Sequence, residues 1–295
     1  MAHLTMLIGL PGAGKSKFAN GQKEHFGNTV VLSSDAIRKE LYGDEQIQDN
    51  PSKVFDTMNK RTIECLKCGK NVIYDATNLR RKNRKHLLKQ VPKDCTKVAI
   101  IVWAKYETCV KRDEERDRHV GVDVIRKMIK NFQPPFYDEG WDVISIFMSD
   151  SAYTKKDYEN WLDCDHDNPH HNNTILEHTN KVVSEALRLP ACRHHNEILL
   201  AAKLHDIGKK FTKGFINAKG EITPIAHFYD HQNVGSYFAI GYEELQGLSL
   251  KMEIFVVWLI NSHMEPFFDS KYYKSLPTTL KNPIDLLHHC DIAGA

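Results

Sequence analysis

Residues 9–16 of the chain read Gly9-Leu10-Pro11-Gly12-Ala13-Gly14-Lys15-Ser16 and fit the pattern G-x-x-x-x-G-K-[ST] at every fixed position. The apolar run 4–8 before them is typical of a buried strand, and residues 15–24 have the pattern of a helix. Glycines let backbone N–H groups curve around an anion, and the start of a helix adds its positive dipole. The sequence therefore predicts a phosphate-binding loop between a strand and a helix.

The motif assigns roles within the loop. Lys15 is expected to reach the β- and γ-phosphates of a nucleoside triphosphate, and Ser16 to ligate Mg²⁺. The other cofactor-binding positions are Gly9, Pro11, Gly12, Ala13 and Gly14. The alternative is a glycine-rich turn that binds nothing, but strand, loop, Lys-Ser pair and helix coincide here. We therefore expect ATP, or another nucleoside triphosphate, with Mg²⁺ in this half of the chain.

The two halves of the chain differ in charge. At 295 residues the chain is long enough for two domains, each with its own core. Residues 1–150 carry 26 Lys and Arg against 20 Asp and Glu, whereas residues 151–295 carry 14 against 18. Twelve of the 16 histidines lie after residue 150. A basic half and a histidine-rich acidic half predict two different chemistries.

The targeting signals and the cysteine pattern of the sequence bear only on the cellular compartment. No apolar run approaches the length of a membrane span, and the chain starts like a strand rather than a signal peptide. The seven cysteines are scattered and odd in number, which is typical of a reducing compartment. Cys65 and Cys68 lack a second pair at zinc-site spacing, so we expect them on a helix with one side chain inward. The default prediction is a cytoplasmic protein without a membrane partner.

The first half alternates strand and helix patterns, which predicts an α/β domain with a parallel sheet flanked by helices over residues 1–150. The expected strands are 4–8, 29–32, 71–74, 98–103 and 143–147. The expected helices are 15–24, 35–42, 51–67, 80–90 and 107–116.

Strand signals almost vanish in the second half. A linker or domain edge is expected over 151–168, in which 153–162 can form one helix, followed by an all-helical domain over 169–295. The helical patterns are 174–188, 194–206, 231–243, 250–263 and 283–292.

Asp35 and Arg38 follow the second expected strand, in the run Ser33-Ser34-Asp35-Ala36-Ile37-Arg38. Ligands bind at the carboxyl edge of such sheets. Asp35 can accept the proton of an attacking hydroxyl. Arg38, one turn further on the same helix face, can hold a phosphate already on the acceptor. The alternative is that Asp35 caps the helix and Arg38 is solvated.

Polar residues also follow the third strand. Asp75 suits a carboxylate close to Mg²⁺, while Thr77 and Asn78 either position a phosphate or make the turn. The basic run 80–85 comes next. Such a run is usually a solvated helix face, and the alternative is a patch that follows polynucleotide phosphates.

Arg112 and Arg116 are four apart on one helix face, and Arg118 follows in a polar stretch. Phosphoryl transfer needs cations at the γ-phosphate, and a mobile lid that bears arginines supplies them. The alternative is ion pairing at the surface with the acidic neighbours Asp113, Glu115 and Asp117.

Residues 4–148 resemble the kinase domain of bacteriophage and bacterial polynucleotide 5′-kinases. The resemblance rests on the loop, the S-x-D-x-x-R element 33–38, the D-x-T-N element 75–78 and the basic lid segment 111–126. Small-molecule P-loop kinases share the loop and the D-x-T-N element, so the S-x-D-x-x-R element carries more of the argument.

The resemblance implies that Asp35 is the general base and that Arg38 holds the 3′-phosphate of the acceptor nucleotide. It implies that Arg112 and Arg116 contact the donor phosphates. The expected acceptor-binding residues are Asp35, Arg38, Thr77 and Asn78.

The second half contains the run Leu204-His205-Asp206-Ile207-Gly208-Lys209. Adjacent His and Asp can both reach one metal only where a helix end presents them together, so other ligands come from other helices. His178 upstream and Asp291 downstream lie in helical apolar patterns that suit this role. The alternative is a set of satisfied core histidines and capping carboxylates.

Residues 165–295 resemble the HD phosphohydrolase superfamily through this H…HD…D order. The resemblance implies that His178, His205, Asp206 and Asp291 hold a divalent transition metal such as Mn²⁺, Ni²⁺, Co²⁺ or Zn²⁺, which activates water. It implies that Lys209 contacts the substrate phosphate, and that His231 and His263 bind a second metal or the phosphate.

The remaining histidines carry weaker expectations. His171 faces the pocket or has a capping or surface role, and His194, His195 and His288 are expected to be structural. The chain ends four residues after Asp291, whereas other members of the superfamily continue, so the resemblance implies a minimal or truncated domain.

Together the halves resemble bacterial RNA end-healing enzymes, although those fusions carry the HD domain first and here the kinase pattern comes first. In that family the HD module removes a 2′,3′-cyclic, 2′- or 3′-phosphate, and the kinase phosphorylates the 5′-OH. The resemblance implies nucleic-acid ends as substrates, RNA rather than DNA, and partnership with an RNA ligase.

Two other functions stay open. One is a small-molecule or nucleoside kinase with a nucleotide-hydrolysing HD domain. The other is a nucleotide-regulated switch without catalysis.

Overall fold

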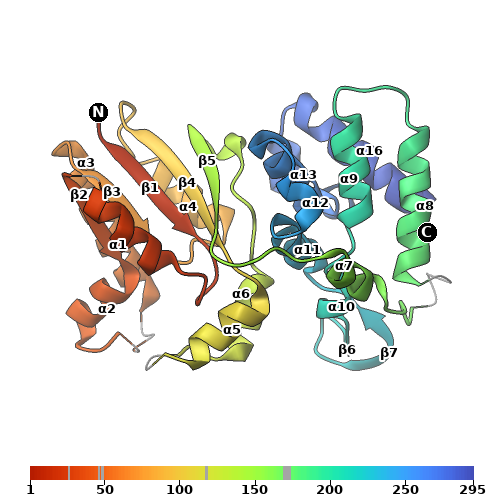
Figure 1. Cartoon of the computed structure of the whole chain (residues 1–295), viewed down its shortest axis with the longest axis horizontal. Coiled ribbons are helices and arrows are strands. Elements are labelled where there is room, and N and C mark those ends of the chain that lie inside the picture. Colours follow the sequence, from red (N-terminus) through yellow and green to blue (C-terminus); the bar gives the residue numbers. More distant parts are fainter. Residues whose placement is uncertain (26, 46, 48–49, 117–118, 169–173) are drawn as a thin grey trace. The chain divides into compact units, whose positions relative to one another are not determined.

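The computed structural model describes the chain except for residues 26, 46, 48–49, 117–118 and 169–173. Arg118 and His171 therefore lie outside the described residues. The chain forms two compact units (Figure 1). The first unit comprises Met1–Met128 and Pro135–Ser151, and the second comprises Ile129–Pro134 and Ala152–Ala295.

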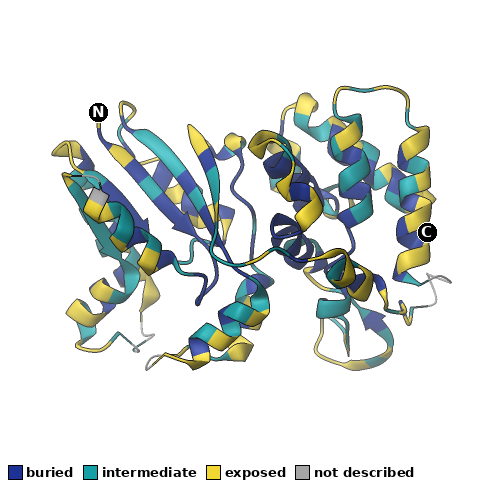
Figure 2. Ribbon diagram, in the orientation of Figure 1, coloured by how far each residue is buried: buried dark blue, intermediate teal, exposed yellow. Residues whose placement is uncertain are grey.

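A five-stranded parallel sheet in the order β2-β3-β1-β4-β5 forms the centre of the first unit. The strands are β1 (His3–Ile8), β2 (Thr29–Ser33), β3 (Asn71–Asp75), β4 (Thr96–Trp103) and β5 (Val143–Met148). The five predicted strands are thus confirmed, each at most two residues longer than expected. Most residues of β1 and β3 and the second half of β4 are buried and drawn dark blue in Figure 2, because helices cover both faces of a parallel sheet.

Five of the helices of this unit lie where the sequence predicts them, whereas the helix over 122–129 was not predicted. The helices are α1 (Lys15–His25), α2 (Ser34–Tyr42), α3 (Pro51–Lys67), α4 (Arg81–Leu88), α5 (Tyr106–Glu114) and α6 (Val122–Ile129), with a 3-10 turn η1 (Tyr137–Glu139). The loop of residues 9–14 connects β1 directly to α1, so the start of that helix faces the loop's interior.

The second unit is mainly helical. Its helices are α7 (Lys155–Leu162), α8 (Ile175–Arg188), α9 (His195–Leu204), α10 (Lys209–Thr212), α11 (His231–Ile240), α12 (Glu243–Gln246), α13 (Leu250–Ser262), α14 (Glu265–Phe268), α15 (Lys271–Ser275) and α16 (Thr278–Ala293). In α13 every residue from 253 to 262 is buried. A helix buried all round lies at the centre of its unit.

The expectation of an all-helical second half is wrong at residues 214–227. An antiparallel hairpin occupies them, formed by β6 (Gly214–Ile216) and β7 (Ile222–His227). The turn is specified locally, because Asn217 Oδ1 accepts from the N–H groups of Lys219 and Glu221, and Gly220 has a φ of 86°. An asparagine and a glycine at this spacing are turn formers, a signal that the helical reading overlooked.

Residues on both sides of β5 belong to the helical unit. Phe132 is fully buried and packs edge-on against Tyr237 at 5.2 Å between ring centroids. Asn233 donates to the carbonyl of Lys130 at 2.7 Å, and Asn261 donates to that of Phe132 at 3.3 Å.

The expected edge segment 151–168 contains α7. Trp161 of this helix stacks on Phe238 at 5.0 Å and an interplanar angle of 13°. Stacking of this kind holds α7 onto α11 within the helical unit. Among the helices that the structure describes, none is both long and apolar enough to cross a bilayer.

Candidate functional site

The phosphate-binding loop packs tightly against its own unit. Gly12 has a φ of 80°, and a Cβ added there would lie 2.3 Å from the carbonyl oxygen of Cys109 on α5. A Cβ at Gly9 would lie equally close to the carbonyl oxygen of Val102, at 2.3 Å. Only glycine allows these close approaches, so the loop's shape is fixed by two backbone contacts.

Lys15, Ser16 and Asp75 lie together at the start of α1. Lys15 Nζ donates to the carbonyl of Leu10 at 2.8 Å, and burial lowers its pKa, although the Asp75 carboxylate opposes this. Ser16 Oγ donates to Asp75 Oδ2 at 2.9 Å. Burial raises the pKa of Asp75 against the opposing effects of Lys15 and Ser16. A hydroxyl and a carboxylate side by side are the oxygen ligands that Mg²⁺ takes in such loops.

Asp35 and Arg38 form an ion pair at the start of α2. Ser33 caps this helix by accepting from the Asp35 N–H at 3.3 Å, so Asp35 is not the cap. Arg38 Nη1 donates to Asp35 Oδ1 at 2.9 Å. The Arg38 side chain is 8% exposed and the Asp35 side chain 49%, so the arginine is not solvated. The buried Nε of Arg38 has no hydrogen-bond partner among the described residues.

Arg112 braces the loop in this structure. Its Nη1 donates to the Ser149 hydroxyl at 3.1 Å and to the carbonyl of Gly12 at 3.3 Å, and its Nη2 donates to the carbonyl of Ser149 at 2.9 Å. Ser149 Oγ in turn donates to the carbonyl of Ala13 at 2.7 Å. Arg112 and Ser149 therefore hold the loop's carbonyl side, a role that no motif indicates for Ser149.

Arg116 is the more exposed lid arginine. Its side chain is 46% exposed, lies 3.9 Å from Asp113, and donates through Nε to the carbonyl of Arg112 at 3.3 Å. Its charge is among those that lower the pKa of Lys15, after the larger effect of burial. The carboxylate of Asp113 also accepts from the N–H groups of Val120 and Gly121, at 2.9 and 3.0 Å. Arg116 therefore pairs with a buried carboxylate rather than with a surface one, while its charge still acts on Lys15.

Thr77 and Asn78 make the turn after β3. The carbonyl of Thr77 accepts from the Gly9 N–H at 3.1 Å. Asn78 has a φ of 49°, and its amide donates to the carbonyl of Leu7 at 2.7 Å. Of the two alternatives that the sequence left open, these contacts favour the turn.

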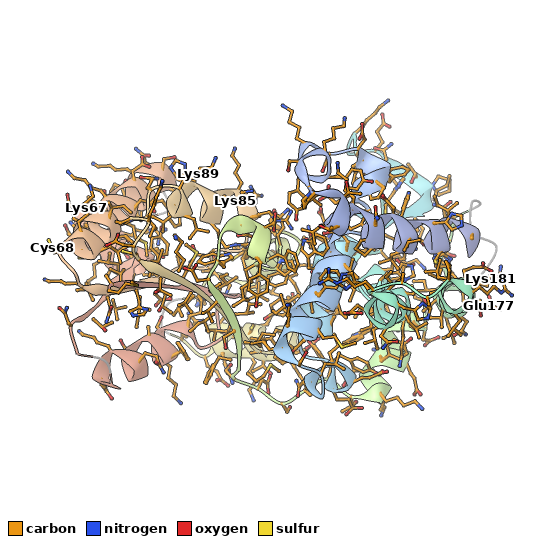
Figure 3. The ribbon with its side chains drawn as sticks, turned by 90° about the horizontal axis from the view of Figure 1, so that it is seen from above. Lys67, Cys68, Lys85, Lys89, Glu177 and Lys181 are labelled. Carbon is orange, nitrogen blue, oxygen red and sulfur yellow. The ribbon has the colours of Figure 1, made fainter. Side chains whose placement is uncertain are left out.

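The basic run on α4 divides into two faces. Arg84 is fully buried and pairs with Glu139 through two hydrogen bonds of 2.8 and 2.5 Å, while Arg81 lies 3.6 Å from the same carboxylate. Neither a solvated face nor a phosphate patch describes these two arginines. Lys85 and Lys89, labelled in Figure 3, are on the outer side of the helix.

Cys68 is exposed at the end of α3, where Figure 3 labels it beside Lys67, and Cys65 is half-buried. Of the pair expected on a helix with one side chain inward, Cys65 lies on α3 and is the more buried, while Cys68 follows the helix.

In the helical unit the four predicted metal ligands come together from three helices. His178 of α8, His205 at the end of α9 and Asp291 of α16 form one group of potential ligands. Nε2 of His178 lies 2.9 Å from Asp291 Oδ1, and Nε2 of His205 lies 3.3 Å from the same oxygen. Asp206 Oδ2 lies 3.2 Å from Nε2 of His205.

His231 and His263 form a second group with Asp206. Their two Nε2 atoms are 3.1 Å apart, and Nε2 of His231 is 3.4 Å from Asp206 Oδ1. The two oxygens of Asp206 therefore face different groups. Glu177 and Lys181, labelled in Figure 3, are exposed on α8 and lie outside this cluster.

Backbone carbonyls orient all four imidazoles. Nδ1 lies 2.7–3.3 Å from the carbonyl oxygen of Gly294 for His178, of Ala202 for His205, of Phe228 for His231 and of Ile260 for His263. A neutral ring that donates through Nδ1–H keeps a lone pair on Nε2. With all four rings neutral, four such lone pairs and two carboxylates would face one another, which is the donor set of a divalent transition-metal site.

The electrostatics of the cluster favour an additional positive charge. Burial lowers the pKa of His205, but the carboxylates of Asp206 and Asp291 outweigh this effect and raise it to about 10. Burial lowers the pKa of His231 to about 4 and that of His263 to about 3, so these rings are neutral at pH 7. Burial opposes ionisation of Asp206, yet His205 and Lys209 hold its pKa well below the usual range.

Lys209 borders the cluster, with its Nζ 2.7 Å from Asp206 Oδ2. The same Nζ lies 3.2 Å from Nε2 of His166 and 5.6 Å from the ring centroid of Phe228. His166 is 1% exposed and was missed by the sequence analysis, because nothing in its surroundings follows a motif.

His194 lies apart from these contacts. Its ring stacks on Phe255 at 4.4 Å, as expected for a structural histidine.

Comparison with known proteins concerns the first unit. Residues 4–135 match a family model described as an AAA domain. The chain is 29% identical over 155 residues to L-seryl-tRNA(Sec) kinase of Methanococcus maripaludis, covering 48% of this chain and 57% of that protein. It is 25% identical over 155 residues to transcription factor bHLH140 of Arabidopsis thaliana, covering 50% of this chain and 16% of that protein. The chain thus spans less than two thirds of either relative.

Similar solved structures include the Pnkp1/Rnl/Hen1 RNA repair complex, with 24% identity over 44% of this chain and 43% of that one and a TM-score of 0.41. A gluconokinase from Sinorhizobium meliloti 1021 has 17% identity over 50% and 82% of the two chains, with a TM-score of 0.37. Together with the sheet and loop described above, the family match makes the first unit a P-loop kinase-like domain.

Proposed function

We propose that the protein repairs RNA ends, with a 5′-hydroxyl kinase in the first unit and a metal-dependent 2′,3′-phosphatase or cyclic phosphodiesterase in the second. The observation that carries the kinase assignment is the Asp35–Arg38 pair, in which a buried guanidinium with an unpartnered Nε lies next to an accessible carboxylate. Free nucleosides and sugars offer no phosphate for such an arginine, whereas a polynucleotide acceptor does.

In the kinase reaction Asp35 takes the proton of the 5′-OH as its oxygen attacks the γ-phosphorus of ATP. The bond from that phosphorus to the β–γ bridging oxygen breaks, and ADP leaves. Lys15 and Arg116 balance the charge on the transferred group, while Arg38 holds the acceptor's phosphate. Arg112 contributes by bracing the loop, in keeping with its contacts to Gly12 and Ser149.

The helical unit is proposed to hold one or two divalent ions through His178, His205, Asp206, Asp291, His231 and His263. A metal bound there supplies an activated water and polarises the substrate's phosphate. Lys209 then binds a phosphate oxygen. Water loses a proton as it adds to phosphorus, the bond to the 2′- or 3′-oxygen breaks, and that oxygen takes up a proton to become a hydroxyl. A cyclic phosphate needs two such hydrolyses to give free 2′- and 3′-hydroxyls and inorganic phosphate.

RNA is the proposed nucleic acid because only RNA carries the 2′-OH from which a 2′,3′-cyclic phosphate forms. The relative named L-seryl-tRNA(Sec) kinase supports an acceptor linked to RNA. The two products, a 5′-phosphate and a free 3′-OH, are the ends that an RNA ligase joins, so we propose such a ligase as functional partner.

The test uses one oligoribonucleotide with a 5′-OH and a 2′,3′-cyclic phosphate, with ATP and Mg²⁺ or Mn²⁺, and both ends are followed. Lys15→Ala is expected to abolish 5′ phosphorylation alone, and His205→Ala to abolish 3′-end hydrolysis alone. Lys17→Ala and His289→Ala, at exposed positions on α1 and α16, are the matched controls. If the wild-type protein leaves one RNA end unchanged with every metal tested, the activity proposed for that end is refuted.

A second comparison addresses the acceptor. Arg38→Ala is expected to lower kcat/KM for a nucleoside 3′-phosphate about 100-fold, because it removes a charge-assisted hydrogen bond to the phosphate. Equal turnover by the variant and the wild type would favour a small-molecule or nucleoside kinase instead. ATP binding without turnover at either end would favour a switch without catalysis.

A further inference from the structure

The contacts of His166 with the cluster include Lys209 and two neighbouring rings. Its Nε2 lies 3.2 Å from Nζ of Lys209, and its ring packs edge-on against His178 and Phe228 at 5.8 and 5.9 Å. Because a lysine ammonium has donors only, Nε2 of His166 is the acceptor.

The segment around His166 is held in place without a helix or strand of its own. The carbonyl of Asp167 accepts from the Ala226 N–H of β7 at 2.9 Å. The Asp167 carboxylate lies 2.7 Å from Nζ of Lys213. These contacts place His166 on a fixed backbone, as a residue that orients another group must be.

Lys209 has two partners, and they respond differently to a cation. In this structure its Nζ lies 2.7 Å from Asp206 Oδ2. A cation bound by Asp206 weakens that attraction, because it repels the ammonium and shares the carboxylate. The neutral acceptor on His166 then holds Lys209 next to the site instead of letting it turn to solvent.

We propose that His166 is a positioning residue, which holds the ammonium of Lys209 where it meets a phosphate oxygen of the substrate. This inference rests on the proposed hydrolase function of the same site. It predicts that His166 acts only through Lys209 and that it does not contribute to holding the metal.

The test is a double-mutant cycle in the full-length protein with His166→Leu, Lys209→Met and the double variant, read by calorimetric binding of inorganic phosphate in the presence of Mn²⁺. Each single variant is expected to weaken phosphate binding about tenfold or more, the loss of one charge-assisted hydrogen bond. The double variant is expected to bind as weakly as Lys209→Met alone, because residues that act through each other are not additive. His166→Gln, whose amide oxygen can accept, is expected to restore most of the affinity.

Additive losses in the cycle, or unchanged phosphate binding in His166→Leu, would overturn the inference. So would a loss of bound Mn²⁺ in His166→Leu, since this would show that the histidine supports the metal ligands themselves. The KM of the wild-type and His166→Leu proteins on the cyclic-phosphate oligonucleotide is expected to differ more than kcat.

The two proposals can fail separately. A non-additive cycle in a protein that hydrolyses no cyclic phosphate would support the role of His166 and refute the function. Full hydrolysis with an additive cycle would do the reverse.

Discussion

Arg84 is a fully buried cation, and its partner Glu139 is buried as well. The guanidinium also donates to the carbonyls of Asn78 and Leu79, at 2.9 and 3.0 Å. The Trp141 indole donates to Glu139 at 3.2 Å. Arg84 belongs to the basic run that could have bound nucleic acid, but its contacts stabilise the turn after β3 instead.

Replacing Arg84 by Met is expected to destabilise the first unit by about 3–5 kcal/mol, because the buried Glu139 loses both hydrogen bonds to its nearest counter-charge, which Arg81 at 3.6 Å does not replace. Urea denaturation of the two proteins measures the difference. Lys82→Met, at an exposed position of the same helix, is the control and should change stability by less than about 0.5 kcal/mol. Equal stability of Arg84→Met and wild type would contradict this prediction.

Glu253 gives a prediction for pH dependence. Burial raises its pKa to about 7 in the folded protein. The folded state then binds more protons than the unfolded state between about pH 4.5 and 7, so this residue costs stability as the pH rises through that range. Glu253→Gln is expected to be more stable than wild type at pH 8, by a margin that vanishes near pH 4. A stability difference between the two proteins that is as large at pH 4 as at pH 8 would contradict this.

At the level of elements, the loop depends on contact between backbones. Gly12→Ala is expected to abolish ATP binding, because its Cβ would meet the Cys109 carbonyl and α5 cannot move away without disturbing Arg112. Gly43→Ala is a matched control, since Gly43 has the same φ of 80° but open space around it. Calorimetry with ATP distinguishes them, and similar losses in both variants would mean that backbone strain alone matters.

The sequence was sufficient to predict the parallel sheet, because each strand is an apolar run bounded by helix patterns and turn residues. It also singled out six residues of the helical cluster as candidate ligands, four through the H…HD…D order and His231 and His263 through the family resemblance. It could not show that Arg112 turns to Gly12 and Ser149, or that His166 meets Lys209. Those contacts join residues 37 to 100 positions apart, and no local pattern encodes them.

At the level of the whole chain, a Phe132 variant tests whether residues 129–134 belong to the helical unit. Phe132→Ala is expected to cost about 3–5 kcal/mol, since it empties a fully buried site against Tyr237. Hydrogen–deuterium exchange should then show lost protection in α11 and α13 and unchanged protection in β1 and β4. Leu187→Ala, at a side chain 59% exposed on α8, serves as control. Loss of protection confined to the sheet would contradict the assignment of this segment.

The placement of residues 129–134 has a consequence for recombination between related genes. Those residues precede β5 in the gene but complete the core that follows it, with Asn233 and Asn261 as their partners. A single crossover near codon 150 would separate the helical unit from the buried Phe132 and leave residues 129–134 attached to the sheet unit. Recombination that transfers one intact unit between related genes therefore needs more than one breakpoint. We expect the segments that encode the two units to have been inherited together.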